Sequence, residues 1–470
     1  MGYPDYGSML ANAFEFPDPL SYPAVSAVRT QQRFNSDTNT AVPAASTILI
    51  WPKTALRVSD VNYTQINGSP FGDNASIDAF GRLRVAEPTT LFDSKFLYGK
   101  APQVWDEVLQ DGNSVWSQEN FSVTISTSAA SAFVIRQTLA HFNYQPGKSN
   151  VTFLTGVLAP ETNIIKRAGL FQGLSAAPYN LTDGMYLEVT TEGPSFNIAK
   201  TVGGVTTITK IPQSNWNVDP FNGTGSSQIN IDFTKGQILI IDYEWLGLGR
   251  VRFGFVLNGK IIYAHYENHL NELTTPYITS SNQPVRYEIR QTGAGSGSMT
   301  QVCSTVITEG GEENVGSALT VELSGNQTVN SAYTPILGIR TAPQFRDLVV
   351  KIQQVDLFNT GNSDMQWKII IDPTIIGGNL TWIRTGTSGT SPVEYAFGSG
   401  SYTLSGGYSI YSNFVSRGTS AGSVGTGDIL GNLGRIGQYI NGTPQIIIIA
   451  ARGISGSTSC WASANLLIKG

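Results

Sequence analysis

The sequence is poor in charge, cysteine and histidine. Only 13% of its 470 residues are charged, about half of the roughly 25% usual in soluble domains. The 29 basic and 34 acidic residues give a net charge of −5, so a broad basic surface that binds nucleic acid is not expected. Cys303 and Cys460 cannot form a disulfide framework, and their spacing fits no zinc motif. We therefore expect no metal and no cofactor.

Long apolar runs are also missing. The longest strongly apolar run, residues 446–451, is far shorter than the roughly 18 residues of a membrane-spanning helix, so no membrane partner is expected. Residues 1–5 contain neither the basic nor the apolar part of a Sec signal, and we expect assembly in a cytoplasm. Hydrophobic residues nevertheless make up 40% of the chain, enough to bury the cores of two or three domains.

The first 60 residues follow neither a helical nor a strand period. They contain six prolines, which sheet interiors exclude, and aromatic residues that are unusual in a freely disordered tail. We expect residues 1–60 to form an extended arm whose aromatic side chains bury against a partner surface, with a floppy tail as the alternative. The docking residues expected in the arm are Tyr3, Tyr6, Phe14, Phe16, Tyr22 and Trp51.

Residues 61–99 are expected to connect this arm to the body of the protein. Apolar and basic side chains alternate over residues 82–85, which indicates a short half-buried strand. The connector residues that stand out are Phe80, Arg82, Arg84, Leu91, Phe92 and Asp93. The string FGRLRV at 80–85, followed by LFDSK at 91–95, resembles a segment of structural proteins of tailed-phage particles. The resemblance implies a virion protein and no catalytic motif.

Residues 100–308 predict one large β-sandwich. Side chains alternate with a period of two over residues 251–257 and 285–289, as in strands with one wet face. Asn258 and Gly259 supply the positive φ angles of a tight hairpin. Short helical turns are expected only at residues 107–110 and 267–273.

The order of these strands also resembles a known fold. The similarity is to concanavalin-like (laminin-G-like) jelly rolls, in which a strand ending in Asn/Asp-Gly lies on the concave sheet. It is carried by residues 167–171, 183–188, 238–245, 250–259 and 284–289.

Residues 314–470 predict a second β-sandwich, separated from the first by the charged, glycine-rich link at 309–313. Residues 385–435 are more than half Gly, Ser and Thr. We expect them to form a long excursion, ordered by its aromatic residues against a neighbour. The last strand is expected to pair back into the same sheet. Parts of this region, residues 335–340, 347–351, 365–369 and 372–373, resemble the C-terminal β modules of phage appendage proteins.

Catalytic constellations are few. Asp242 and Glu244 would share one face of a strand and could hydrolyse a glycosidic bond, but residue 240 is isoleucine where related glycosidases carry a third carboxylate. We expect them instead to lie on the wet face of the strand and to pair across strands with Arg250, Arg252 or Arg286. His265 and His269 could share a metal on a helix, yet no third ligand follows at helical spacing. No catalytic residues are therefore assigned.

Aromatic residues of the first sandwich could bind sugars, because their rings could stack on sugar faces; alternatively they form the core. The possible glycan contacts are Trp216, Tyr243, Trp245 and Tyr263.

The sequence thus predicts an all-β, non-enzymatic protein with an extended N-terminal arm, a concanavalin-like jelly-roll β-sandwich and a C-terminal β-sandwich. We expect a structural component of a virus particle, as a capsid decoration, an appendage or a tail-associated protein. Its expected partners are other virion proteins and copies of itself, with a trimer as the assembly. A host-surface glycan is a further candidate partner. The alternatives are a glycan- or receptor-binding lectin-like module and, behind it, a glycoside hydrolase.

Overall fold

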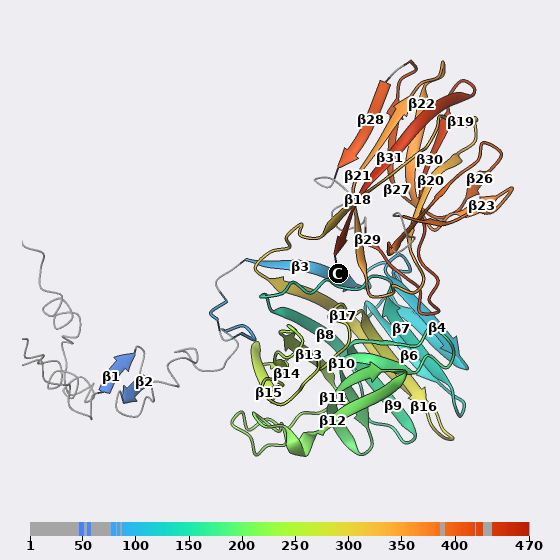
Figure 1. Ribbon diagram of the computed structural model, residues 1–470. Helices are drawn as coiled ribbons and strands as arrows, with labels where there is room; N and C mark the ends of the chain where they lie inside the picture. Colours follow the sequence, from blue (N-terminus) through green and yellow to red (C-terminus); the bar gives the residue numbers. More distant parts are fainter. Residues whose placement is uncertain are drawn as a thin grey trace, which may run out of the picture. The chain divides into compact units, whose positions relative to one another are not determined.

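The computed structural model (Figure 1) describes residues 47–50, 54–57, 77–80, 82–84, 87–385, 391–418, 420–425 and 435–469. The chain divides into two compact units, of which the first comprises Met1–Ile77 and Gly81–Leu83. In that unit β1 (Thr47–Ile50) pairs antiparallel with β2 (Thr54–Arg57). The six aromatic residues of the predicted docking arm lie outside the described residues.

The second unit, Asp78–Phe80 and Arg84–Gly470, begins with a sandwich of two large antiparallel sheets. Its seven-stranded sheet has the order β12-β11-β10-β9-β16-β7-β4. These strands are β4 (Trp105–Gln110), β7 (Phe133–Thr138), β9 (Ile164–Gly173), β10 (Leu181–Thr190), β11 (Gly193–Val202), β12 (Val205–Pro212) and β16 (Val285–Gln291).

The eight-stranded sheet includes β15-β14-β13-β8-β17-β6-β5 in that order, and β3 pairs with β17 beside this path. The strands are β3 (Pro88–Lys95), β5 (Gly112–Ser117), β6 (Ser122–Thr127), β8 (Asn150–Val157), β13 (Gly236–Tyr243), β14 (Val251–Leu257), β15 (Lys260–Glu267) and β17 (Gly297–Glu309). The predicted connector comprises residues 61–99. Because its second half contains β3, that half is part of the sandwich.

The core of the first sandwich lies between these two sheets and is rich in aromatic rings. Phe196 of β11 stacks on Phe253 of β14, with ring centroids 4.6 Å apart, and on Trp216 at 4.4 Å. The predicted Asn258-Gly259 hairpin is confirmed: Leu257 pairs with Lys260, and both turn residues have positive φ. The period of two predicts one apolar face for each strand, and burial of these faces between the two sheets stabilises the sandwich.

The helical turns expected in this sandwich were wrong. Residues 107–110 belong to β4, which pairs with β7 along its whole length, and residues 267–273 end β15 and then turn. Local helix propensity is weak over so few residues, and the ladder with β7 overrides it.

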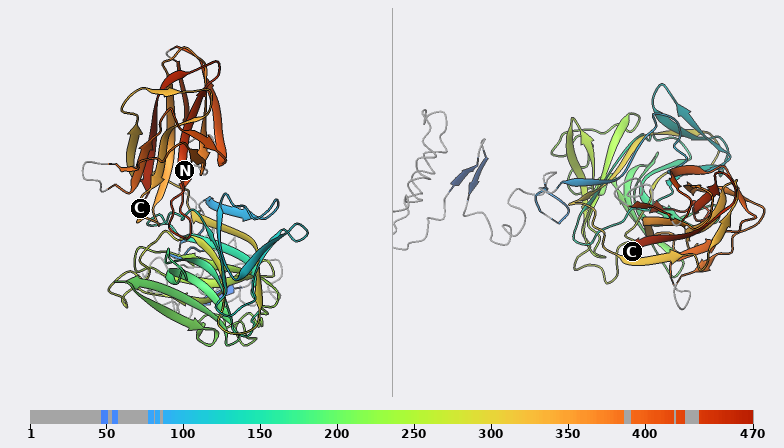
Figure 2. Two further views of the ribbon diagram at one scale, coloured as in Figure 1. Left: turned by 90° about the vertical axis from the view of Figure 1, so that its right-hand side faces the viewer. Right: turned by 90° about the horizontal axis from the view of Figure 1, so that it is seen from above.

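The C-terminal sandwich, coloured orange to red in Figure 1, also has two sheets, and Figure 2 shows its layers from two further sides. One sheet includes β18-β31-β21-β28, with β19 and β29 at its sides, and the other has the order β24-β25-β20-β30-β22-β27. The first contains β18 (Ser317–Glu322), β19 (Gln327–Val329), β21 (Val349–Asn359), β28 (Ser420–Gly425), β29 (Arg435–Ile436) and β31 (Thr458–Lys469). The second contains β20 (Thr334–Thr341), β22 (Met365–Ile371), β24 (Ile383–Arg384), β25 (Val393–Phe397), β27 (Tyr408–Val415) and β30 (Ile447–Gly453).

The terminal strand β31 pairs with β18 and β21, as predicted. The Gly-, Ser- and Thr-rich excursion, residues 385–435, differs from the prediction in its described part. There it forms strands, among them β25 and β27, which hydrogen-bond to β20 and β22. Backbone ladders need no particular side chain, and the half-buried rings of Tyr395 and Tyr411 supply the apolar contact with the core.

The link between the two sandwiches is held by charge. Glu312 lies between β17 and β18, and its carboxylate forms salt bridges with Lys351, Arg435 and Lys469. Burial alone would raise the pKa of Glu312, but these three cations lower it. The link is therefore fixed to the C-terminal sandwich by an ionised carboxylate.

The predicted all-β class, with a jelly-roll sandwich followed by a second sandwich, is confirmed by these sheets. In the part of the chain that the structure describes, no helix has the length and apolar character needed to cross a membrane.

We expect the core of the C-terminal sandwich to be sensitive to truncation. Ile449 of β30 is fully buried, whereas Ile376 is 51% exposed. Ile449→Ala should lower the free energy of unfolding of this sandwich by about 2–5 kcal/mol. Ile376→Ala, the matched control, should change it by less than about 1 kcal/mol. Urea titration of the full chain measures both, and equal losses would contradict the assigned core.

Candidate functional site

Asp242, one of the two carboxylates considered for hydrolysis of a glycosidic bond, is fully buried on β13 and is surrounded by donors. Its Oδ2 accepts hydrogen bonds from Arg84, Arg252 and the Tyr263 hydroxyl, the last at 2.6 Å, and its Oδ1 accepts one from Ser149 at 2.8 Å. The expected pairing with Arg252 across strands is confirmed by the register, but Asp242 is buried and does not lie on the wet face that the sequence predicts. A carboxylate with four donors is suited to holding segments together.

Glu244 has a different set of contacts. Its Oε1 accepts the backbone N–H of Arg250 at 3.1 Å, and its carbonyl accepts the Tyr277 hydroxyl at 2.8 Å. Glycoside hydrolysis needs one carboxyl group that can donate a proton and a second that faces the same bond. Asp242 is shut off from solvent and Glu244 closes a turn, so the pair does not have this geometry.

A second carboxylate centre lies on the outer face of the seven-stranded sheet. Glu288 of β16 is fully buried and forms salt bridges with Arg167, Arg286 and Arg290. Arg167 of β9 also reaches Glu188 of β10 at 2.9 Å, so its guanidinium lies between the two glutamates. The register sets Glu188, Arg167 and Glu288 side by side across three neighbouring strands.

The electrostatics of this network also oppose acid catalysis. Burial alone would raise the pKa of Glu288, but Arg286, Arg290 and Arg167 outweigh it and hold the pKa well below its usual range. Glu288 therefore remains ionised and cannot act as a general acid near neutral pH.

The histidines have separate partners. His265 Nε2 lies 2.7 Å from Glu267, whereas His269 Nδ1 lies 2.6 Å from the Gly249 carbonyl. Within the described ranges, no three side chains of His, Cys, Asp or Glu gather as a metal site requires.

The structure corrects the assignment of glycan contacts to the first sandwich. Trp216, Tyr243 and Tyr263 are at most 5% exposed. Trp216 and Tyr243 belong to the core, and the Tyr263 hydroxyl is engaged by Asp242. Trp245 is half-buried and donates to the Ile278 carbonyl. Burying a large aromatic ring between the two sheets stabilises the fold, so these rings pack in the core and are not exposed to a ligand.

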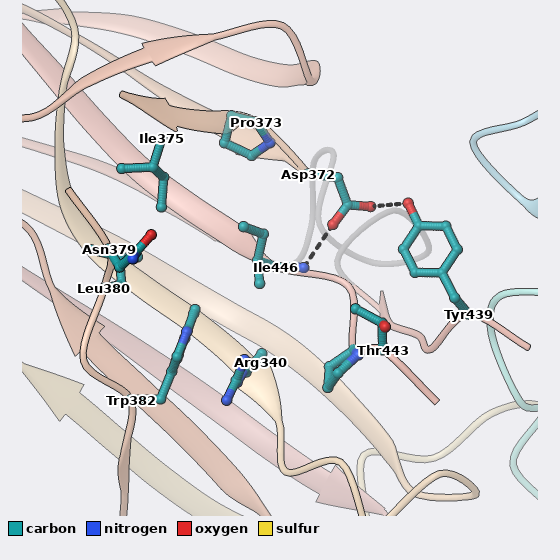
Figure 3. A pocket seen from close by; sticks show the side chains of 11 residues that line it. Arg340, Asp372, Pro373, Ile375, Asn379, Leu380, Trp382, Tyr439, Thr443 and Ile446 are labelled. Carbon is teal, nitrogen blue, oxygen red and sulfur yellow. Dashed lines mark hydrogen bonds between the residues drawn. The ribbon is translucent and has the colours of Figure 1, made fainter. Parts of the chain in front are cut away.

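A cavity of about 330 Å³ lies in the C-terminal sandwich (Figure 3). It opens beside the two-stranded sheet of β23 (Thr374–Ile376) and β26 (Thr403–Ser405). Its lining comes from three stretches that are distant in the sequence: Arg340; Asp372, Pro373, Ile375, Asn379, Leu380 and Trp382; and Tyr439, Thr443, Pro444 and Ile446.

One side of the cavity is polar and fixed. Asp372 follows β22 with a positive φ of 49°. Its Oδ1 accepts the N–H of Ile446 at 2.8 Å, and its Oδ2 accepts the Tyr439 hydroxyl at 2.8 Å and the Gln445 amide at 3.1 Å. Burial and the neighbouring Asp372 carboxylate raise the pKa of Tyr439, so its hydroxyl remains a donor.

The opposite side is apolar. Figure 3 shows Ile375, Leu380 and Trp382 facing Asp372, Tyr439 and Thr443 across the opening. The guanidinium of Arg340 lies over the Trp382 ring, 4.2 Å from its centroid, and forms a salt bridge with Glu394 at 2.7 Å. These contacts fix the indole in place.

Sequence reasoning missed this cavity. The sequence points to Asp372 and Pro373 only through a family resemblance, and it assigns Trp382 to a short strand-like segment and not to a site. The three contributing stretches come together through the ladders of β20, β22 and β30, which no local pattern specifies.

Comparisons with known proteins identify no family. No family model and no curated protein matches the chain. Among solved structures, the carbohydrate recognition domain of Emp47p is similar at 11% identity, covering 48% of this chain and 98% of that one, with a TM-score of 0.31. A legume lectin-like domain from Entamoeba histolytica is similar at 11% identity, covering 48% and 100%, with a TM-score of 0.30.

A glycoside hydrolase family 16 endo-glucanase from Bacteroides ovatus is similar at 8% identity, covering 46% of this chain and 99% of that one, with a TM-score of 0.30. At TM-scores this low the similarities carry no argument about binding or hydrolysis.

We expect Glu288 to govern the acid stability of the first sandwich. Its pKa is lower when folded than in the unfolded chain, where it is about 4.3, so its contribution is present above that pH and is lost as the pH falls below it. Glu288→Gln should cost about 3–5 kcal/mol near pH 7, because the buried Arg286 loses its salt bridge and two half-buried arginines each lose one.

Urea titrations between neutral pH and pH 3 would measure this effect, with Glu192→Gln, an exposed glutamate on the β10–β11 turn, as the matched control. The difference between wild type and Glu288→Gln should shrink in acid. A difference that is independent of pH would contradict the role given to the carboxylate.

Proposed function

We propose that the chain is a non-enzymatic structural component of a tailed-phage particle that docks through its N-terminal arm and assembles with copies of itself. The observation that carries the proposal is the attachment of the connector to the jelly roll at Arg84. This residue belongs to the string that resembles virion proteins, so the resemblance and the structural joint fall on the same segment.

The joint is a branched salt bridge. Arg84 reaches Asp242 on β13 and Glu309 at the end of β17, the latter at 2.6 Å. Next to it, the Ala79 carbonyl accepts two hydrogen bonds from Arg250, at 3.0 and 3.2 Å. A segment that must transmit load from an arm to a rigid body benefits from such side-chain anchors, because charge-assisted hydrogen bonds are the stronger ones.

The proposal of a non-enzymatic role is supported by the state of the buried carboxylates. Asp242 and Glu288 are each surrounded by arginines, and Glu312 by cations of the C-terminal sandwich. These carboxylates stabilise the fold, and the cations around Glu288 and Glu312 lower the pKa of both groups, opposite to the shift that a general acid needs.

The arm is tested by deleting residues 1–60 and measuring incorporation into particles when the chain is co-expressed with the other particle proteins. We expect the truncated chain to fold with unchanged thermal stability and to be absent from purified particles. Incorporation at the normal level would contradict docking through the arm.

The joint is tested separately with Arg84→Gln. Loss of the guanidinium removes a positive charge that neutralises Asp242 and Glu309, so the connector is held less firmly. Limited proteolysis should therefore cleave the full chain faster between residues 77 and 87. Arg417→Gln, an exposed arginine of the C-terminal sandwich, is the matched control. Cleavage at the wild-type rate in Arg84→Gln would show that the salt bridge does not hold the connector.

Self-assembly is tested by light scattering of the full chain. A mass of three chains is expected, as in many closed, symmetric assemblies. A monomer at all concentrations would contradict the proposed assembly.

A further inference from the structure

We propose that the cavity of the C-terminal sandwich is a binding site for a neutral glycan, one or two pyranose rings in size. This site is separate from the arm and from its joint, and it does not use the aromatic residues of the first sandwich. The proposal rests on the two-sided chemistry of the cavity, its unused polar groups and its charge.

The two sides of the cavity match the two surfaces of a sugar ring. A pyranose has an apolar C–H face and a rim of hydroxyl groups. In the cavity, Ile375, Leu380 and Trp382 supply an apolar wall opposite Asp372, Tyr439 and Thr443 (Figure 3). Binding pockets generally combine apolar walls with a few fixed polar groups that set orientation.

Polar groups remain available at the opening. The Thr443 hydroxyl and the Asn379 side-chain amide have no hydrogen-bond partner among the described residues, and both residues are exposed. The Oδ1 atom of Asp372 accepts one hydrogen bond, from Ile446, and a carboxylate oxygen can accept another. A ligand rich in hydroxyl groups can use all three positions.

The walls are set before a ligand arrives. Trp382 is held by the Arg340 guanidinium, which Glu394 fixes in turn. Gly338 of β20 leaves room beneath it, since a Cβ there would lie 3.1 Å from both Leu380 and Trp382. Pre-organised side chains lose little conformational entropy on binding.

The charge of the site selects against anions. Arg340 is neutralised by Glu394, and Asp372 adds a further carboxylate, so the surroundings carry a net negative charge. A phosphate or nucleotide would be repelled by this negative charge, and among the described residues no unpaired cation lines the cavity to offset the repulsion. A neutral sugar would not be repelled. The cavity of about 330 Å³ is at the small end of ligand pockets, which span roughly 300–1,000 Å³.

The test uses the full chain and saturation-transfer difference NMR with methyl glycopyranosides of glucose, galactose, mannose and N-acetylglucosamine. At least one should bind with a dissociation constant in the millimolar range or below, with the strongest transfer to its ring C–H protons. Inorganic phosphate should not compete. If none of the four binds, or if phosphate displaces the sugar, the proposal is wrong.

Variants locate the binding. Trp382→Ala should weaken it about tenfold, and Thr443→Val, an isosteric change at an exposed position that spares the fold, about threefold. The matched controls are Trp461→Ala, which removes a 41% exposed tryptophan from β31, and Thr328→Val on β19. Both should bind as the wild type does.

Binding that survives both Trp382→Ala and Thr443→Val would place the sugar elsewhere and overturn the assignment. A synthetic peptide of residues 13–24, rich in proline and aromatic residues, is the competing occupant, since such segments dock in aromatic-lined grooves. If this peptide shifts the Trp382 indole resonance and the sugars do not, the cavity is a peptide site.

Discussion

A buried charge must be neutralised where it lies, and this requirement organises the protein. The chain has few charged residues, yet three carboxylates with little or no exposure each gather two or more cations. Glu288 fixes the outer face of the seven-stranded sheet, Asp242 and its arginines fix the connector, and Glu312 fixes the link between the sandwiches. Removing one partner of such a group costs more than the pair contributes, because the remaining charge stays buried.

The pairing of these three buried carboxylates with cations also limits the chemistry that they can perform. An acid or base needs a free lone pair or an exchangeable proton next to a substrate. The buried carboxylates instead direct their oxygens to guanidinium, ammonium and hydroxyl groups of the chain itself. On the rim of the small cavity, by contrast, the side chains of Asn379 and Thr443 have no hydrogen-bond partner among the described residues, and the proposed ligand would use them.

The proposed attachment and the proposed binding site lie in different parts of the chain. The connector is fixed to the first sandwich through Arg84 and through the β3–β17 ladder. The cavity belongs to the C-terminal sandwich and is built on β20, β22 and their connecting loops. The proposed docking and the proposed glycan binding therefore use different residues.

The sequence alone determined the all-β class, the hairpin at Asn258-Gly259, the return of the last strand and the pairing of Asp242 with an arginine. A period of two, a turn dipeptide and opposite charges on neighbouring strands are signals that the sequence carries. Tertiary structure decided the rest. It placed Asp242, Trp216 and Tyr243 in the interior, formed strands in the described part of the Gly- and Ser-rich excursion, and brought residues 340, 372–382 and 439–446 together around a cavity. Which faces are covered, and which distant segments meet, depends on sheet pairing between residues far apart in the chain, and no local pattern encodes it.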